Sequence, residues 1–138
     1  MEHADIWDED AARRYDTPGL GRFAPEVLGP TVDRLAELAD GGRALELAIG
    51  TGRVAVPLAA AGVPVAGIEL SQPMIDQLRT KVAADVMPVT LGDMRTARVE
   101  GTFRLVFLVF NGISNVLTQD DQIAVFDNAA RHLDLVMR

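Results

Sequence analysis

The sequence contains no cysteine, little positive charge and no long hydrophobic run. Without cysteine, the 138-residue chain has no disulfides, no thiolate nucleophiles and no cysteine-ligated zinc. The longest purely apolar segment, residues 105–110, is far shorter than the roughly 20 residues that span a bilayer. These absences argue against a disulfide scaffold and against a membrane-spanning helix, so we expect no membrane partner.

Acidic residues outnumber basic ones. The chain has 13 Lys and Arg against 20 Asp and Glu, which gives a formal net charge of -7. Binding to a nucleic-acid backbone depends on basic side chains that neutralise phosphates, so we expect no nucleic-acid partner. Residues 2–10 are acidic where an export signal has basic residues before an apolar core, and we therefore expect a cytoplasmic protein.

The length and the 49% share of hydrophobic residues are typical of one compact globular unit. We expect residues 1–40 to form an N-terminal helical cap. One helix is predicted around Ile6 to Tyr15, and a second from Pro30, which ends at Gly41-Gly42. Residues 41–138 are expected to form the core.

From residue 44 onward, short apolar runs alternate with helical patterns. The runs at 44–48, 63–68, 86–91 and 103–110 read as strands, and the last of these is apolar enough for a strand covered on both faces. Helices are predicted at 53–61, after a Ser71 cap, and after a Thr118 cap, the last with an apolar face of Ile123, Phe126, Ala130 and Leu133. This alternation predicts an α/β fold with a doubly wound parallel sheet.

The residues that follow three of these strands are suited to bind one nucleoside-sized ligand. Residues 46–52 read ELAIGTG, in which the glycines permit a sharp turn and the next helix presents N–H groups to an anion. Glu69 ends the second strand and Asp93 follows the third. Each feature alone also suits a plain turn or a solvated acid, but ligands bind at the carboxyl ends of parallel strands, where all three occur.

These residues resemble the class I S-adenosylmethionine-dependent methyltransferases of the small-molecule branch, whose first motif reads roughly E/D-x-G-x-G-T-G. The resemblance extends through GIELSQPMIDQLRTK, LGDMR, VFNGISNVLTQDDQ and ARRYD, which together cover essentially the whole chain. It implies a Rossmann-like fold, S-adenosylmethionine as the cofactor and methyl transfer to a small-molecule acceptor.

The same resemblance assigns the cofactor contacts. Gly50 and Gly52 would admit the methionine part and Glu46 would lie near its amino end. The other assigned contacts are Glu69 to the ribose, Leu70 and Met74 beside the adenine, Asp93 to the adenine amine with the Met94 backbone alongside, Phe110 and Asn111 beside the sulfonium, and Tyr15 closing the site.

Ala48 departs from the motif, which has glycine at this position. Its methyl group is tolerable if the residue has a negative φ, and it interferes if the cofactor touches the α-carbon, so we expect weakened cofactor binding.

An NAD-type dinucleotide site is the competing interpretation, because residues 50–55 also satisfy G-x-G-x-x-G/A and Glu69 follows. Glu46 argues against it, since a carboxylate beside the glycine turn repels a pyrophosphate but attracts the ammonium and sulfonium of S-adenosylmethionine.

No catalytic base and no metal site are predicted. His132 is interpreted as a helix C-terminal residue favoured by the dipole, and Asp120-Asp121 as helix N-terminal acids.

The chain has four predicted strands where the family has seven, so strand four would lie at a sheet edge. We therefore expect self-association, such as a homodimer, through this edge or the C-terminal tail. A truncated, non-catalytic cofactor-binding module, or one subunit of a split enzyme, is the alternative function.

Overall fold

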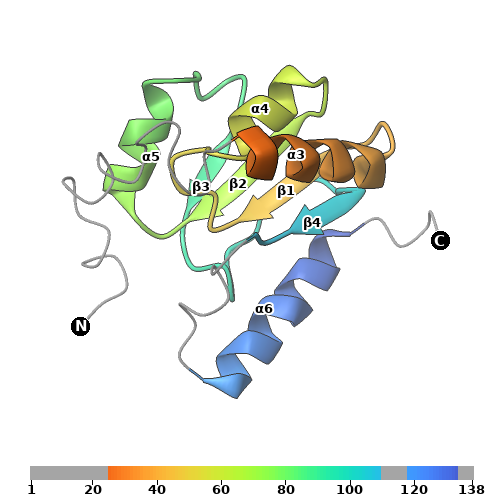
Figure 1. Cartoon of the computed structure of the whole chain (residues 1–138). Coiled ribbons are helices and arrows are strands. Elements are labelled where there is room, and N and C mark those ends of the chain that lie inside the picture. The colour runs from red at the N-terminus through yellow and green to blue at the C-terminus, as the bar shows by residue number, and fades with distance from the viewer. Residues whose placement is uncertain (1–24, 110–117, 134–138) are drawn as a thin grey trace.

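A computed structural model describes residues 25–109 and 118–133 of the chain, and these residues form alternating helices and strands (Figure 1). The elements in chain order are α3 (Pro25–Ala39), β1 (Ala44–Leu47), α4 (Ala55–Ala60), β2 (Val65–Glu69), α5 (Gln72–Arg79), β3 (Val89–Leu91), β4 (Leu105–Phe107) and α6 (Gln119–His132).

The strands form one parallel sheet in the order β3-β2-β1-β4. Because the connections are crossovers, the carboxyl ends of all four strands lie along the same edge of the sheet. Helices cover both faces, with α3 and α4 on one side and α6 on the other (Figure 1). The predicted doubly wound α/β fold is therefore confirmed, and among the described residues β4 lies at a sheet edge, as expected.

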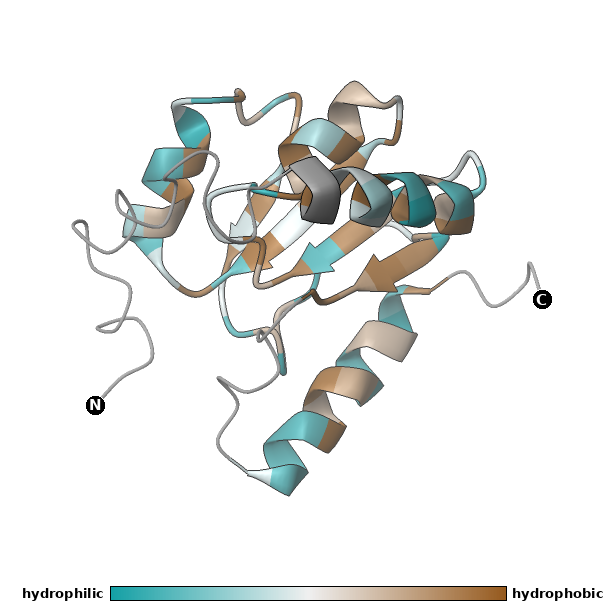
Figure 2. Ribbon diagram, in the orientation of Figure 1, coloured by the Kyte–Doolittle hydropathy of each residue, from teal (hydrophilic) through white to brown (hydrophobic). Residues whose placement is uncertain are grey.

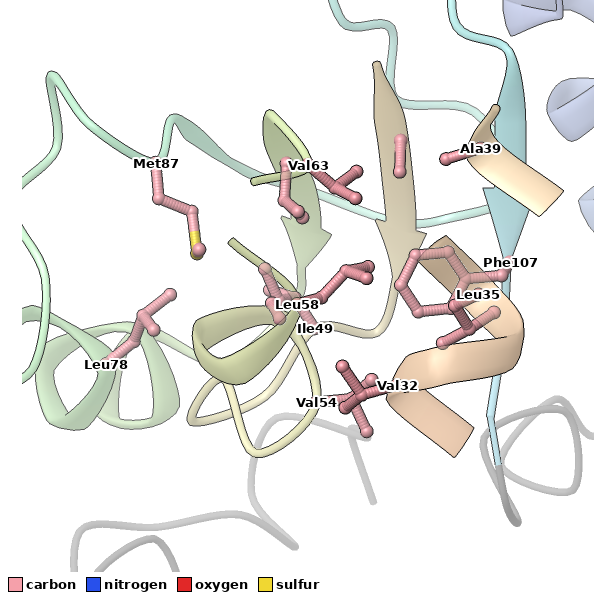
Figure 3. Close-up of a cluster of buried hydrophobic side chains, with 13 residues drawn as sticks. Val32, Leu35, Ala39, Ile49, Val54, Leu58, Val63, Leu78, Met87 and Phe107 are labelled. Atoms are coloured by element: carbon pink, nitrogen blue, oxygen red, sulfur yellow. The ribbon is translucent and has the colours of Figure 1, made fainter. Parts of the chain in front are cut away.

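The larger core lies between the sheet and the helices α3, α4 and α5. Ile49 and Leu58 lie near its centre, between Leu78 of α5 on one side and Leu35 of α3 on the other (Figure 3). Gly67 of β2 permits this packing, because a Cβ at this position would lie 2.5 Å from the Cδ1 of Ile49. The turn after β1 is thus anchored directly to the core.

A second, smaller core lies between the other face of the sheet and α6. Leu45, Leu47 and Ile68 of the sheet pack there with Phe103 and with Val125 of α6. Successive residues of β1 alternate between the two cores, as side chains of a strand do. The sheet is therefore buried on both faces at its centre.

The helix caps that the sequence predicts are present. The Ser71 side chain accepts a hydrogen bond from the Met74 amide at the start of α5, and the Thr118 side chain accepts one from the Asp121 amide at the start of α6. These two caps fix where the helices begin.

Several predicted boundaries are wrong. Helix α3 begins at Pro25, five residues before the predicted start at Pro30, which lies inside the helix. The strands are shorter than predicted, since apolar runs continue into turns that pack on the core. Helix α4 spans residues 55–60 and not 53–61, because Gly52 to Val54 still belong to the turn.

The predicted apolar face of α6 is also wrong. Ile123 and Phe126 are 60% and 65% exposed, and the buried residues of the helix are Val125, Asn128 and His132. Strand β4 is only half-buried, apart from Phe107, and so is not covered on both faces. Both differences leave apolar surface on the side of the molecule that β4 and α6 form.

The predicted helix at Ile6–Tyr15 lies outside the described residues, as do Tyr15, Phe110 and Asn111. In the described ranges, no helix has the length and apolar character that a bilayer span requires.

Candidate cofactor site

The turn after β1 has a backbone that glycine suits. Gly50 and Gly52 have φ values of 63° and 83°, in the left-handed region that residues with a Cβ rarely adopt. A Cβ on Gly52 would collide with Leu78 and Val56 in the protein interior. The second glycine is therefore required by packing within the domain as well as by the sharp turn.

Ala48 also has a positive φ, of 54°. The condition under which its methyl group would be tolerated without strain, a negative φ, is therefore not met. A non-glycine residue in the left-handed conformation costs roughly 1–2 kcal/mol. The turn holds this alanine in a conformation that glycine adopts freely.

Glu69 connects this turn to the loop after β2. Its Oε1 accepts a hydrogen bond of 2.8 Å from the Gly50 amide, and its Oε2 accepts one of 3.0 Å from the Ser71 amide. Burial raises the pKa of Glu69, while the hydrogen bonds from backbone amides, that of Ser71 first, oppose the rise. The carboxyl group is thus held at the sheet edge by two neighbouring loops.

Glu46 is buried near the end of β1, with 3% of its surface exposed. Its Oε1 has no hydrogen-bond partner among the residues that the structure describes. Burial raises the pKa of Glu46 well above its ordinary value, although the nearby Arg53 charge lowers it and the charge of Glu69 raises it further. Glu46 and Glu69 therefore lie close enough to influence each other.

Asp93, after β3, lies next along the same edge but has a charged partner. Its Oδ2 accepts a hydrogen bond of 2.9 Å from Arg95 Nε, and Arg95 Nη1 lies 2.7 Å from Asp121 Oδ1 at the start of α6. The Gly92 amide donates to the Glu69 carbonyl, so the loops after β2 and β3 are directly joined. The structure therefore brings Glu46 and Glu69 together and places Asp93 one strand away.

The remaining described site residues follow β2 and β3. Leu70 is 39% exposed, whereas Met74 is buried in α5 with its Cε 3.1 Å from where a Gly50 Cβ would stand. Met94 is half-buried and packs against the second core. Leu70 thus presents apolar surface at the sheet edge, and Met74 closes the space beside the glycine turn.

Comparison with known proteins identifies the family. A family model described as "Methyltransferase domain" matches residues 44–134, which include the whole sheet. The chain belongs to the class I S-adenosylmethionine-dependent methyltransferases. The methyltransferase match begins at the first residue of β1 and so contains the glycine turn, Glu69 and Asp93.

Similar methyltransferases come from several bacteria. The cypemycin N-terminal methyltransferase of a Streptomyces species is 29% identical over 96% of this chain and 54% of its own length. The structure of the CcbJ methyltransferase from Streptomyces caelestis matches with a TM-score of 0.85 and 34% identity, over 98% of this chain and 55% of that one.

CalS10, an amino pentose methyltransferase from Micromonospora echinaspora whose structure contains bound SAM, matches with a TM-score of 0.69 and 25% identity. It is covered over 51% of its length, against 91% of this chain. The chain thus spans about half the length of these methyltransferases.

The structure shows that the residues of this methyltransferase chain suit the cofactor. The orphaned Oε1 of buried Glu46 is an acceptor available for an ammonium group. The two oxygens of Glu69 are held by backbone amides with acceptor capacity to spare for hydroxyl groups. Asp93 is the least available of the three acids for a ligand, because Arg95 already binds its carboxylate.

Two supporting interactions escape the sequence pattern. Lys81 Nζ donates a hydrogen bond of 2.9 Å to the Thr51 carbonyl and so holds the glycine turn from the loop after α5. Asn128 donates to the carbonyls of Met94 and Ala97, and so fixes the loop after β3. A lysine 30 residues from its partner gives no local signal, so sequence reasoning did not find it.

His132 is the last residue of α6, as the sequence predicts, and it also makes hydrogen bonds that the sequence does not reveal. Its ring is buried, Nε2 accepts a hydrogen bond of 3.0 Å from the Val99 amide, and Nδ1 lies 2.8 Å from the Asn128 carbonyl. Because the Val99 amide can only donate and the Asn128 carbonyl can only accept, the two ring nitrogens connect two backbone segments. His132 is therefore a structural residue between α6 and the loop before β4.

Among the residues that the structure describes, no group of three or more His, Cys, Asp or Glu side chains is placed to hold a metal ion.

Proposed function

We propose that this chain binds S-adenosylmethionine at the carboxyl ends of β1, β2 and β3, and that the protein transfers its methyl group to a small-molecule acceptor. The observation that carries this proposal is the pair of buried carboxyl groups, Glu46 and Glu69, on either side of the glycine turn. Two acidic groups at this point favour a ligand with a cationic amino-acid end and a ribose.

The same geometry disfavours a dinucleotide. A pyrophosphate needs free backbone N–H groups at the glycine turn. Here the Gly50 amide donates to Glu69 Oε1 and the Gly52 amide donates to the Ile49 carbonyl at 3.2 Å. Both amides are already used, and the acceptors around them repel phosphate. The charge and the hydrogen bonding therefore favour the methyl donor over NAD.

Methyl transfer needs little side-chain chemistry, because the sulfonium already activates the methyl carbon towards in-line displacement. The contribution of this chain is to orient the donor: Glu46 would receive the ammonium group, Glu69 the ribose hydroxyls and Leu70 with Met74 the adenine. Asp93 would accept a hydrogen bond from the exocyclic amine of the adenine, with the Met94 backbone beside it. We assign no catalytic base.

The other sequence-based assignments complete this proposal. Phe110 and Asn111 follow β4 and would border the sulfonium, and Tyr15 would close the site from the N-terminal cap, residues 1–40. Similar proteins are named for a cypemycin N-terminus and for an amino pentose, which supports a small-molecule acceptor. The net charge of -7 supports the absence of a nucleic-acid partner, and the cytoplasmic location stays a prediction.

Calorimetry with S-adenosylmethionine, S-adenosylhomocysteine and NAD tests the cofactor assignment. We expect both adenosyl compounds to bind one to one and NAD not to bind. Leu70→Asp places a charge beside the adenine and should weaken binding at least tenfold, whereas Leu38→Asp, at a similarly exposed leucine of α3, should leave binding unchanged. Binding of NAD alone would refute the proposal.

Glu69→Ala should also abolish cofactor binding, but it leaves the Gly50 and Ser71 amides without their acceptor and should lower stability by about 2–3 kcal/mol. Binding is therefore compared at a temperature where a thermal melt shows the variant folded. Detection of methyl transfer to any small-molecule amine or hydroxyl then separates a working enzyme from the alternative, a non-catalytic binding module.

We further propose that the chain associates with itself through β4 and the outer stripe of α6, defined as Ile123, Phe126 and Ala130. Strand β4 is hydrophobic along its length (Figure 2). Within the described residues it pairs with β1 on one side, and the segment before it makes only the single bridge between Phe103 and Leu133. The outer stripe is exposed, and apolar surface next to an open strand edge favours pairing.

Light scattering across micromolar concentrations tests this association. The wild-type protein should be a dimer, and Phe126→Lys should shift it towards the monomer. Val86→Lys is the matched control, because Val86 is about as exposed as Phe126 but lies in the loop before β3. A wild-type protein that stays monomeric, or two lysine variants that behave alike, would contradict the proposed interface.

A further inference from the structure

Glu46 is a buried carboxyl group on the face of the sheet that packs against the larger core, a face it shares with Glu69 of β2. It is in register with Phe107 of β4, and Ala44, two residues earlier in β1, points to the same face. Ala44 and Phe107 both belong to the larger core. The side chain of Glu46 therefore lies on the face that α3 and α4 cover, at the end nearest the glycine turn.

Few charges face Glu46 in the described part of the chain. Arg53, from the turn before α4, and Glu69, from β2, are both buried and act on it electrostatically. Helix α4 contains no ionisable side chain. Those in the described part of α3 are exposed to solvent, namely Asp33, Arg34 and Glu37. Arg53 favours the charged carboxylate, whereas Glu69 and burial favour the neutral acid.

We propose that Glu46 is protonated in the ligand-free protein and releases its proton when the ammonium group of the cofactor arrives, so that cofactor binding is coupled to proton release. This inference rests on the proposed function of the site. The O–H bond of the carboxyl group breaks, the electron pair stays on the oxygen, and the proton passes to the buffer. The cationic ligand then balances the buried charge.

The energetic reason is the lack of hydrogen bonds to Oε1. A buried carboxylate oxygen without a donor is costly, so the protein alone favours the neutral form. An ammonium group supplies both donors and a positive charge, which reverses that preference. The coupling therefore requires the amino-acid end of the ligand and not its adenosine part.

Calorimetry in two buffers of different ionisation enthalpy, phosphate and Tris at pH 7, measures the protons released. We expect S-adenosylhomocysteine to release up to one proton, and its affinity to rise by up to tenfold per pH unit between pH 5.5 and 7.5. Methylthioadenosine has the same adenosine part without the amino-acid end and should show neither effect. Equal buffer dependence for the two ligands, or none for S-adenosylhomocysteine, would overturn the inference.

Glu46→Gln replaces the carboxyl group by a neutral group of the same shape and should bind S-adenosylhomocysteine more weakly, without proton release. Glu37→Gln removes an exposed carboxylate of α3 and should behave like the wild type. Proton release that persists in Glu46→Gln would refute the role of Glu46. If neither adenosyl ligand binds the wild type, the proposed function fails instead, so the two failures are distinguishable.

Discussion

Ala48 is a single residue whose backbone conformation conflicts with its side chain. With φ at 54° it bears strain that glycine would not. Replacement by glycine relieves this strain, but it also adds conformational freedom to the unfolded chain. That added freedom cancels roughly 0.4–1 kcal/mol of the gain in stability. We predict that Ala48→Gly raises the free energy of unfolding by about 0.5–1 kcal/mol, as measured by urea denaturation.

Ala61→Gly is the matched control, because Ala61 is exposed and has a φ of -81°. There the same substitution relieves no strain and should lower stability. If both variants lose stability to the same extent, Ala48 is not strained.

Glu46 predicts a pH dependence of stability. Its raised pKa means that the folded protein holds this proton more tightly than the unfolded chain does. The stabilisation that protonated Glu46 contributes is therefore complete below the pKa of a glutamate in the unfolded chain, about 4.3. It is lost as the pH rises towards the pKa of Glu46 in the folded protein. Relative to the wild type, Glu46→Gln should gain stability as the pH rises from 4.5 to 8, by at most about 1.4 kcal/mol per unit.

Thermal unfolding of both proteins across this pH range measures the difference. A constant difference between the wild type and Glu46→Gln would show that Glu46 titrates alike in the folded and unfolded states.

At the residue scale, the sequence predicted the acids of the proposed site but not their hydrogen-bond partners. Glu69 was recognisable because it ends an apolar strand after a glycine turn. Its bond to the Gly50 amide was not, since that contact depends on how two parallel strands align. The contact of Arg95 with Asp121 was not recognisable either, because it joins the loop that holds Asp93 to a helix residue 26 positions further on.

At the scale of elements, α6 shows where hydrophobic periodicity fails. The apolar series that begins Ile123 and Phe126 predicts one buried face, yet the helix buries Val125, Asn128 and His132. Asn128 and His132 are buried because backbone groups of residues 94–99 supply their hydrogen bonds. A pattern that counts only apolar residues cannot register such polar docking.

This docking predicts that Asn128 is more important for stability than its polarity suggests. Asn128→Ala removes the donor to the Met94 and Ala97 carbonyls and should cost about 2–3 kcal/mol in denaturant unfolding. Asp127→Ala, one position away in an exposed ion pair with Arg131, should cost less than about 0.5 kcal/mol. Similar losses in the two variants would contradict the docking role.

At the scale of the whole molecule, strand and helix alternation was enough to predict the architecture. Parallel strands need crossovers, so the order of elements implied a sheet with its functional loops at one edge. The position of β4 at the open edge followed from the same reasoning. The exact ends of the strands could not be predicted in this way, because they depend on where the chain turns to pack on the core, as at Gly52.

Amide chemical-shift mapping during a titration with S-adenosylhomocysteine tests most directly whether the cofactor binds at this edge. We predict that the largest saturable shifts occur in the glycine turn at Gly50 and Gly52, at Leu70 and at Met94, all beyond the carboxyl ends of β1–β3. Shifts concentrated instead at the opposite edge, around Gly62 and Met87, or no saturable shifts in the folded protein, would contradict a cofactor site built on Glu46 and Glu69.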